Sequence, residues 1–283
     1  MARPKRDPMN VLRPYVAAFV ARFKTMLQYR AAALAGFTTQ CWWGGLKVMV
    51  FAAFYRHSTH AHASMTLSQV ITYTWVGQAL LTLQPWGGDP EVAAAVRTGG
   101  VSYDRLRPVD TYAWWFIRAT AWMTARAVPR AALMFAAAAV LLPWAGFDAW
   151  AWRAPADATQ AGLFAISLLL MILLGAAFTM LVNLCITATL TDRGINTLAP
   201  ALVILFSGNL IPLGLFPDWL QPVLIAQPFA GMLDIPTRIY IGALSGGGAW
   251  GGLALQVFWT LVFVMLGRKG IDSVMTRLEV QGG

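Results

Sequence analysis

The residues best suited to hold a metal ion are three histidines in one polar stretch, residues 56–65. His57, His60 and His62 are the only histidines of the chain, and imidazole is a common ligand of zinc and copper. The stretch contains no carboxylate and no thiol that would complete a ligand set. We therefore predict no metal site here and interpret the histidines as solvated loop residues.

Catalytic chemistry that needs carboxylates is missing from the long apolar runs. The spans predicted below contain no Asp or Glu, and Lys47 is the one cation expected near the middle of a span. The phosphate-binding loop, the dinucleotide-binding glycine turn, the zinc helix H-E-x-x-H and the G-x-S-x-G nucleophile turn are all absent. Ion-coupled transporters and intramembrane proteases depend on such groups, so both classes are disfavoured. If this protein moves a solute uphill, another chain must supply the energy.

Charged residues of both signs lie close together in one segment outside the apolar runs, residues 87–118. An Asp-Pro-Glu triplet begins at Asp89, and Asp suits a helix N-cap while Pro suits its first turn. Paired glycines from Gly99 onward then end the helical pattern. We predict a short helix over residues 91–97 that projects from the protein and docks a partner; the alternative is a solvated loop.

Aromatic and basic residues then recur every four positions. They are Trp114, Arg118, Trp122, Arg126 and Arg130. Residues four apart share one helix face, and arginine is costly at the bilayer centre. We expect these side chains to reach headgroups beside a tryptophan belt. In a second interpretation, Arg126 and Arg130 face an inner vestibule and attract anionic headgroups.

Apolar stretches dominate the 283-residue chain, which is 58% hydrophobic and 12% charged, with a mean hydropathy of +0.59. A soluble domain carries roughly a quarter charged residues, whereas runs of about 20 apolar residues cross a bilayer. We predict an all-α polytopic membrane protein of about six transmembrane helices. The expected spans are residues 31–55, 67–86, 119–143, 160–189, 195–213 and 248–267.

The basic residues lie mainly on one side of these spans. With a cytoplasmic N-terminus, only Arg56, Arg153 and Arg238 of the 21 Lys and Arg residues fall outside, and Lys47 lies within a span. This positive-inside pattern predicts that both termini are cytoplasmic. It also explains the net charge of +9, so we expect membrane lipids and no nucleic acid among the partners.

Two further segments are expected to flank or interrupt the bundle. Residues 1–30 are predicted to form a cytoplasmic amphipathic helix in the headgroup plane, followed by a single transmembrane domain over residues 31–283. Its apolar face should contain Leu12, Tyr15, Val16, Phe19, Val20, Phe23 and Leu27. In residues 212–242, prolines interrupt short apolar pieces, which predicts broken helices that re-enter the outer leaflet.

Taken in order, these features resemble the permease subunits of type-2 ABC exporters, and most closely a bacterial subfamily whose ATPase is encoded separately. The resemblance spans nearly the whole chain, including the N-terminal helix, the six spans and the run 97–110, where the family has a Gly followed by a Leu-Leu-x-Arg-Pro-like turn. At 103–106 this chain has Tyr-Asp-Arg-Leu where a leucine run is common. The outer part of the resemblance runs from Ile211-Pro-Leu-Gly-Leu-Phe-Pro217 through Gln227-Pro-Phe229 and Ile235-Pro236 to Tyr240-Ile-Gly242.

The resemblance implies a permease dimer in the bacterial plasma (inner) membrane, formed by two copies or by a homologous pair. Two ABC ATPase subunits would bind ATP and Mg²⁺, while this chain would be no enzyme and hold no cofactor. The residues implied in ATPase coupling are Glu91, Arg97, Asp104, Arg105, Arg107 and Pro108. Those implied along the translocation path are Gln40, Trp42, Trp43, Thr74, Gln78, Ser207 and Asn209. The outer gate would involve Pro212, Phe216, Pro217, Pro228 and Pro236.

Two other function classes remain open at this point. A membrane-embedded lipid-modifying enzyme would need clustered acids or bases, but Asp104 and Asp110 are expected on the side opposite the histidines. The second open class is a non-catalytic membrane scaffold subunit. The 13 Trp and 15 Phe residues suit a hydrophobic or amphiphilic substrate, with a lipid-linked glycan as the next choice, although interfacial belts use the same residues.

Overall fold

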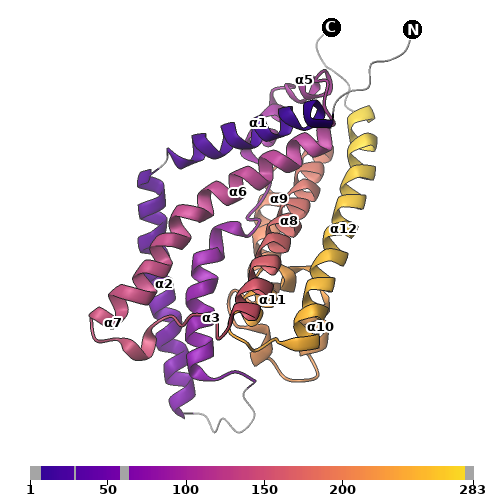
Figure 1. Ribbon diagram of the computed structural model, residues 1–283. Coiled ribbons are helices and arrows are strands. Elements are labelled where there is room, and N and C mark those ends of the chain that lie inside the picture. Colours follow the sequence, from indigo (N-terminus) through magenta and orange to yellow (C-terminus); the bar gives the residue numbers. More distant parts are fainter. Residues whose placement is uncertain (1–7, 29, 58–63, 278–283) are drawn as a thin grey trace.

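The computed structural model describes residues 8–28, 30–57 and 64–277, and every regular element in these ranges is a helix. This confirms the all-α prediction for the described part of the chain. The lengthwise helices are α2 (Arg30–His57), α3 (Leu67–Leu80), α6 (Thr111–Ala136), α8 (Ala158–Thr189) and α12 (Gly246–Arg277), whereas α1 (Pro8–Leu27) lies across one end (Figure 1). We call this the α1 end. The start of α6 and the end of α12 also lie there (Figure 1).

Within the described residues, three helices are long and apolar enough to cross a membrane: Thr111–Trp144, Ala158–Thr189 and Gly246–Val274. They correspond to the third, fourth and sixth predicted spans. The first of them is α6 continued by a π-helical turn and by α7 (Leu142–Trp144). It begins at Thr111, and not at the expected residue 119, because the Asp110 side chain accepts the N–H of Ala113 and caps the helix.

The other predicted spans coincide with helices that are shorter or less apolar. α2 has 28 residues, but Gln40, Lys47 and two tryptophans lower its hydropathy. α3 has 14 residues and continues into a short 3-10 turn. α9 (Ile195–Phe206) has 12 residues and ends well before the expected residue 213. The cause is Gly208, whose φ of +86° lies outside the helical region.

The main hydrophobic core lies where α3, α6 and α8 meet. Its buried side chains include Val76, Leu80, Met123 and Met171. At Gly175 the helices approach so closely that a Cβ would lie 2.7 Å from Met123 Cε. Residues 70–80 of α3 are all buried, and α3 packs against both α2 and α6, so it is an interior helix.

α1 packs along the first half of α6 (Figure 1). Tyr15 accepts the backbone N–H of Asp110 at 3.1 Å, and the rings of Phe19 and Phe23 stack 5.8 Å apart. Leu12 and Val16, from the same predicted apolar face, are exposed. The apolar face is thus divided between the protein and its surroundings, as suits a helix at a membrane surface.

The segment predicted as broken helices, residues 212–242, consists of short helical pieces. They are η4 (Leu213–Leu215), α10 (Gln221–Ala226), η5 (Pro228–Met232) and α11 (Asp234–Tyr240). Pro212 precedes η4, Pro228 opens η5, and Pro236 lies in the first turn of α11. Because proline lacks an N–H, each helical piece can begin at such a residue without losing a hydrogen bond.

A buried carboxylate connects this segment to the bundle. Asp234 is 0% exposed, and its Oδ1 accepts both the Tyr73 hydroxyl and the N–H of Leu213, each at 2.9 Å. The Arg238 guanidinium lies 3.5 Å from Oδ2. A buried charge requires partners of this kind, so Asp234 fixes η4 and α11 against α3.

Candidate functional site

The short helix predicted over residues 91–97 is present as α4 (Pro90–Arg97). Asp89 is its N-cap, with Oδ1 accepting the N–H of Glu91 at 2.9 Å, and Pro90 occupies the first position. Gly99, with φ +73°, follows the last turn. This local structure forms for the reason given by the sequence: an Asp-Pro start satisfies free N–H groups, and glycine allows the reversal that ends the helix.

The start of α4 lies on the helices beneath it. The N–H of Asp89 donates to Asn183 Oδ1 at 2.7 Å, and the N–H of Gly88 donates to Asn196 Oδ1 at 3.1 Å. A Cβ on Gly88 would lie 2.5 Å from Ile186 Cδ1. The first turn of α4 is therefore packed directly onto α8 and α9.

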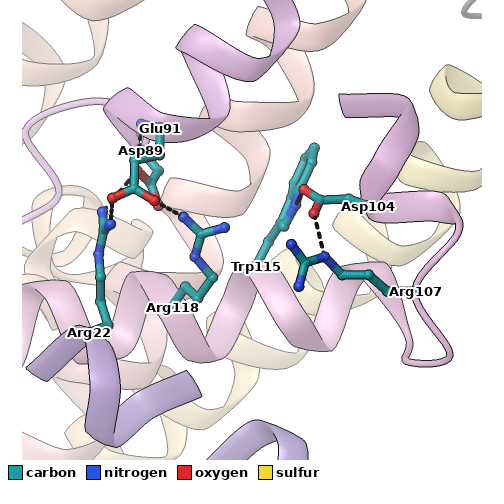
Figure 2. A network of polar contacts seen from close by, with 7 residues as sticks. All are labelled: Arg22, Asp89, Glu91, Asp104, Arg107, Trp115 and Arg118. Atoms are coloured by element: carbon teal, nitrogen blue, oxygen red, sulfur yellow. Dashed lines mark hydrogen bonds and ion pairs between the residues drawn. The ribbon is translucent and has the colours of Figure 1, made fainter. Parts of the chain in front are cut away.

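Ion pairs join α4 to α1 and α6. Figure 2 shows Arg22 from α1 and Arg118 from α6 converging on the start of α4, where both contact Glu91 and Arg22 also contacts Asp89. Arg22 lies 3.3 Å from Asp89 and also pairs with Glu91, while Arg118 donates to Glu91. Burial raises the pKa of Asp89, and the charges of Arg22 and Arg118 oppose that shift. Burial also lowers the pKa of Arg22.

At its other end, α4 is linked to the α8–α9 turn through Arg97, whose guanidinium lies 3.2 Å from Asp192. Sequence reasoning had counted Arg22 only as a cytoplasmic charge and Arg118 only as part of the aromatic and basic stripe. No local signal pointed to this pairing, because the sequence has no Lys or Arg between Arg56 and Arg97.

A second short helix, α5 (Val101–Arg105), follows at the α1 end (Figure 1). Asp104 accepts hydrogen bonds from Trp115 Nε1 at 2.9 Å and from Arg107 Nε at 3.0 Å (Figure 2). Tyr103 and Leu106 are 70% and 79% exposed. The side chain of Arg105 lies outside the described residues.

We call residues 89–107 the α4–α5 unit. Four of the residues predicted to couple to an ATPase, Glu91, Arg97, Asp104 and Arg107, pair with side chains of this same chain. Pro108, which follows, is exposed. The unit therefore buries Val92, Val96 and Val101 against the bundle, while its paired charges stay partly exposed beside the exposed side chains of Tyr103 and Leu106.

A large pocket of about 1400 Å³ lies between α2, the end of α3 and the segment after α9. We call it the side pocket. Five residues predicted for the path or the gate line it: Trp43, Gln78, Asn209, Phe216 and Pro217. Further lining comes from Leu46, Val50, Phe51, Phe54, Leu81 and Trp86. Its wall is mainly apolar, as in sites for hydrophobic molecules.

The polar part of the side pocket is centred on Lys47. Its ammonium donates to the backbone oxygen of Asn209 at 2.5 Å and to Asn209 Oδ1 at 3.0 Å. The amide nitrogen of Asn209 in turn donates to Gln84 Oε1 at 3.0 Å. From sequence, Asn209 was predicted for the path, but Lys47 was recognised only as an unusual cation within a span.

The remaining predicted path and gate residues lie elsewhere. Gln40 and Ser207 are buried away from the side pocket, and Trp42 is exposed on α2. Thr74 and Pro212 line a small space behind Lys47. Pro228 and Pro236 belong to the short helices η5 and α11 and are not among the side-pocket residues.

The described residues contain no group of three His, Cys, Asp or Glu side chains suited to a metal ion. His57 is described, with Nδ1 2.9 Å from the Ala53 oxygen, whereas His60 and His62 lie outside the described ranges. Cys41 and Cys185 are free thiols.

Comparison with known proteins identifies a relationship over most of the chain. A family model described as "ABC-2 family transporter protein" matches residues 42–282. The matched region includes both the α4–α5 unit and most of the side pocket. No curated protein sequence matches the chain.

Proposed function

This chain belongs to the ABC-2 family of transporter membrane proteins, and we propose that it is the permease subunit of an ATP-driven exporter. Family membership implies an ATPase partner. On this proposal the partner binds ATP and Mg²⁺, and this chain forms the path without hydrolysing ATP. The protein lies in the bacterial inner membrane with about six crossings and both termini in the cytoplasm, as the distribution of Lys and Arg predicts.

The observation that carries the proposal is the attachment of the α4–α5 unit. Ion pairs of Glu91 with Arg22 and Arg118 join this unit to α1 and α6, and Arg97 joins it to the α8–α9 turn. A displacement of α4 by a partner must therefore move these helices. This is the mechanical connection that ATP-driven transport requires.

The outer surface of the same unit supplies the contact with the ATPase. Tyr103 and Leu106 are large, apolar and mostly exposed, and residues of this kind commonly anchor protein interfaces. On the membrane side, α2 exposes Trp42, Met49 and Val50 beside the side pocket. A second permease, identical or homologous, covers this face of α2 and closes the pocket into a path.

The side pocket accepts a hydrophobic or amphiphilic substrate. Its aromatic and aliphatic wall suits an apolar body, and Lys47 with Asn209 offers a polar contact for a headgroup. Movement of α4 on ATP binding shifts the balance between inward-open and outward-open arrangements of α2 and α3.

The proposal is tested by co-purification with the ATPase from the native host. Replacing Tyr103→Ala and Leu106→Ala together should weaken association with the ATPase at least about tenfold and abolish stimulated hydrolysis. The control is Trp144→Ala, because Trp144 is 86% exposed but lies on α7, away from the α1 end. Unchanged association in the Tyr103 and Leu106 variant, or equal loss in the control, would refute the proposed contact.

A further inference from the structure

We propose that a cavity between α1, α2 and α6 binds the phosphate of an anionic phospholipid. The cavity has a volume of about 510 Å³ and lies where the chain turns from α1 into α2. Its walls include Met26, Leu27, Leu34, Trp122, Arg126 and Arg130. It is separate from the side pocket, with which it shares no lining residue.

Two arginines give the cavity its charge. The Arg126 guanidinium lies over the Trp122 ring, 4.4 Å from its centroid. Arg130, one turn further along α6, donates from Nη2 to the backbone oxygen of Ala32 at 3.0 Å. Both side chains are half-buried, and within the described residues neither has a carboxylate at ion-pair distance.

Other half-buried arginines of α1 and α6 differ in this respect. Arg22 pairs with Asp89 and Glu91, and Arg118 pairs with Glu91. Half-buried cations without a counter-charge are unfavourable, and two of them one turn apart also repel each other. An anion in the cavity would remove both costs, and guanidinium groups bind phosphate with two parallel hydrogen bonds.

The chain also leaves space for this arrangement. A Cβ on Gly36 would lie 2.5 Å from Cζ and 2.6 Å from Nε of Arg130. The guanidinium therefore lies directly against the backbone of α2, and a larger residue at position 36 would displace it. The absence of a side chain at Gly36 and the hydrogen bond to Ala32 thus place Arg130 at the cavity wall.

The walls identify the source of the phosphate. Leu27, Leu34 and Leu133 surround the arginines with aliphatic surface suited to acyl chains. The neighbouring helix α1 exposes Val16 and Val20, as expected for a helix at the membrane surface. A phospholipid satisfies both parts of the site, whereas free phosphate uses only the arginines.

The experiment measures binding of phosphatidylglycerol to the purified full-length chain by native mass spectrometry in detergent. Phosphatidylcholine and inorganic phosphate serve as competing ligands. Arg126→Gln with Arg130→Gln should weaken phosphatidylglycerol binding about 30-fold, since each arginine near an anionic surface contributes about a factor of five. Gly36→Ala should weaken it without changing charge. Arg126→Lys with Arg130→Lys should bind more tightly than the glutamine variant but less tightly than the unchanged protein, because the charge is kept while the paired hydrogen bonds are lost.

The matched control is Arg153→Gln with Arg193→Gln, which removes the same charge from exposed positions outside the cavity. It should bind phosphatidylglycerol as the unchanged protein does. Equal loss in this control, or no loss in Gly36→Ala, would overturn the site. Equal affinity for phosphatidylcholine would overturn its anionic selectivity, and displacement by equimolar inorganic phosphate would overturn the lipid assignment.

Discussion

Lys47 and Asn209, 162 residues apart in sequence, form the polar centre of the side pocket: the ammonium contacts both the backbone and the side-chain oxygen of Asn209. The contact joins α2 to the segment after α9, which are the two main walls of the pocket. A change of distance between these walls must therefore break or strain this contact.

Replacing Lys47→Met should lower the stability of the protein. The substitution keeps the approximate length of the side chain but leaves Asn209 Oδ1 without its donor, at a cost of about 1–3 kcal/mol. Thermal unfolding in detergent measures the effect, with Lys269→Met as control because Lys269 is exposed near the end of α12. Equal unfolding temperatures for the Lys47 variant and the unchanged protein would show that the contact carries no stability.

The ion pair between Glu91 and Arg118 should be strongly coupled. A double-mutant cycle with Glu91→Gln and Arg118→Met should give a coupling free energy of about 1–3 kcal/mol, because the guanidinium is mostly buried. The same cycle at Asp192 and Arg97, where the arginine is 58% exposed, should give only about 0.2–1 kcal/mol. Thermal unfolding of the four variants in each cycle provides the measurement. Equal coupling at the two sites would contradict the assigned role of Glu91.

Asp89 should make stability depend on pH in a defined direction. Burial raises the pKa of its carboxyl above the ordinary value of 3.8, so the folded state holds the proton more tightly than the unfolded state. The stabilisation that protonation provides is complete below that ordinary value and is lost as pH rises through the folded pKa. Asp89→Asn retains an oxygen for the N–H of Glu91 but cannot titrate.

The measurement is the difference in unfolding temperature between the unchanged protein and Asp89→Asn, followed from pH 4 to 7. Relative to the variant, the unchanged protein should lose stability as pH rises, since other titrating groups cancel in the difference. A difference that moves in favour of aspartate with rising pH would mean that the charges of Arg22 and Arg118 outweigh burial.

Gly88→Ala should displace the start of α4. The added Cβ would meet Ile186 Cδ1 at 2.5 Å and Asn183 Oδ1 at 2.8 Å, and overpacking of this kind costs about 1–3 kcal/mol. ATPase stimulation should fall together with thermal stability. Gly162→Ala is the control, because nothing lies within 4 Å of its added Cβ and alanine favours a helix by about 1 kcal/mol. Unchanged ATPase stimulation in the Gly88 variant would show that transmission through α4 does not depend on the position of its first turn.

The parts of the structure that could be predicted from sequence are those decided by neighbouring residues. The cap at Asp89, the helix that follows it and the proline-separated pieces after Pro212 all depend on local hydrogen bonding, and all are found. Span boundaries were less accurate at the third and fifth spans. There the local signals at Asp110 and Gly208 are stronger than the hydropathy on which the boundaries were based.

Contacts between distant segments could not be predicted. Arg22 gave no indication of its partners, because pairing with Asp89 requires α1 to lie along α6. The same holds for Asn183, whose side-chain oxygen accepts the N–H of Asp89 across 94 residues of sequence. Of the predicted path residues, Trp43 and Gln78 line the side pocket while Gln40 does not, since one sequence does not fix the rotation of a helix about its axis.

The continuous helix from Thr111 to Trp144 has a geometric consequence for long-range motion. Its 34 residues span about 50 Å, with Arg118 near one end and α7 at the other. A rigid tilt of about two degrees at the α1 end would carry the far end through roughly 2 Å, given that length. Pro129 and the π-helical turn interrupt the helix on the way, and both reduce its bending stiffness. The helix therefore has two points at which it can bend, and these points determine how much of a tilt at the α1 end is transmitted to α7.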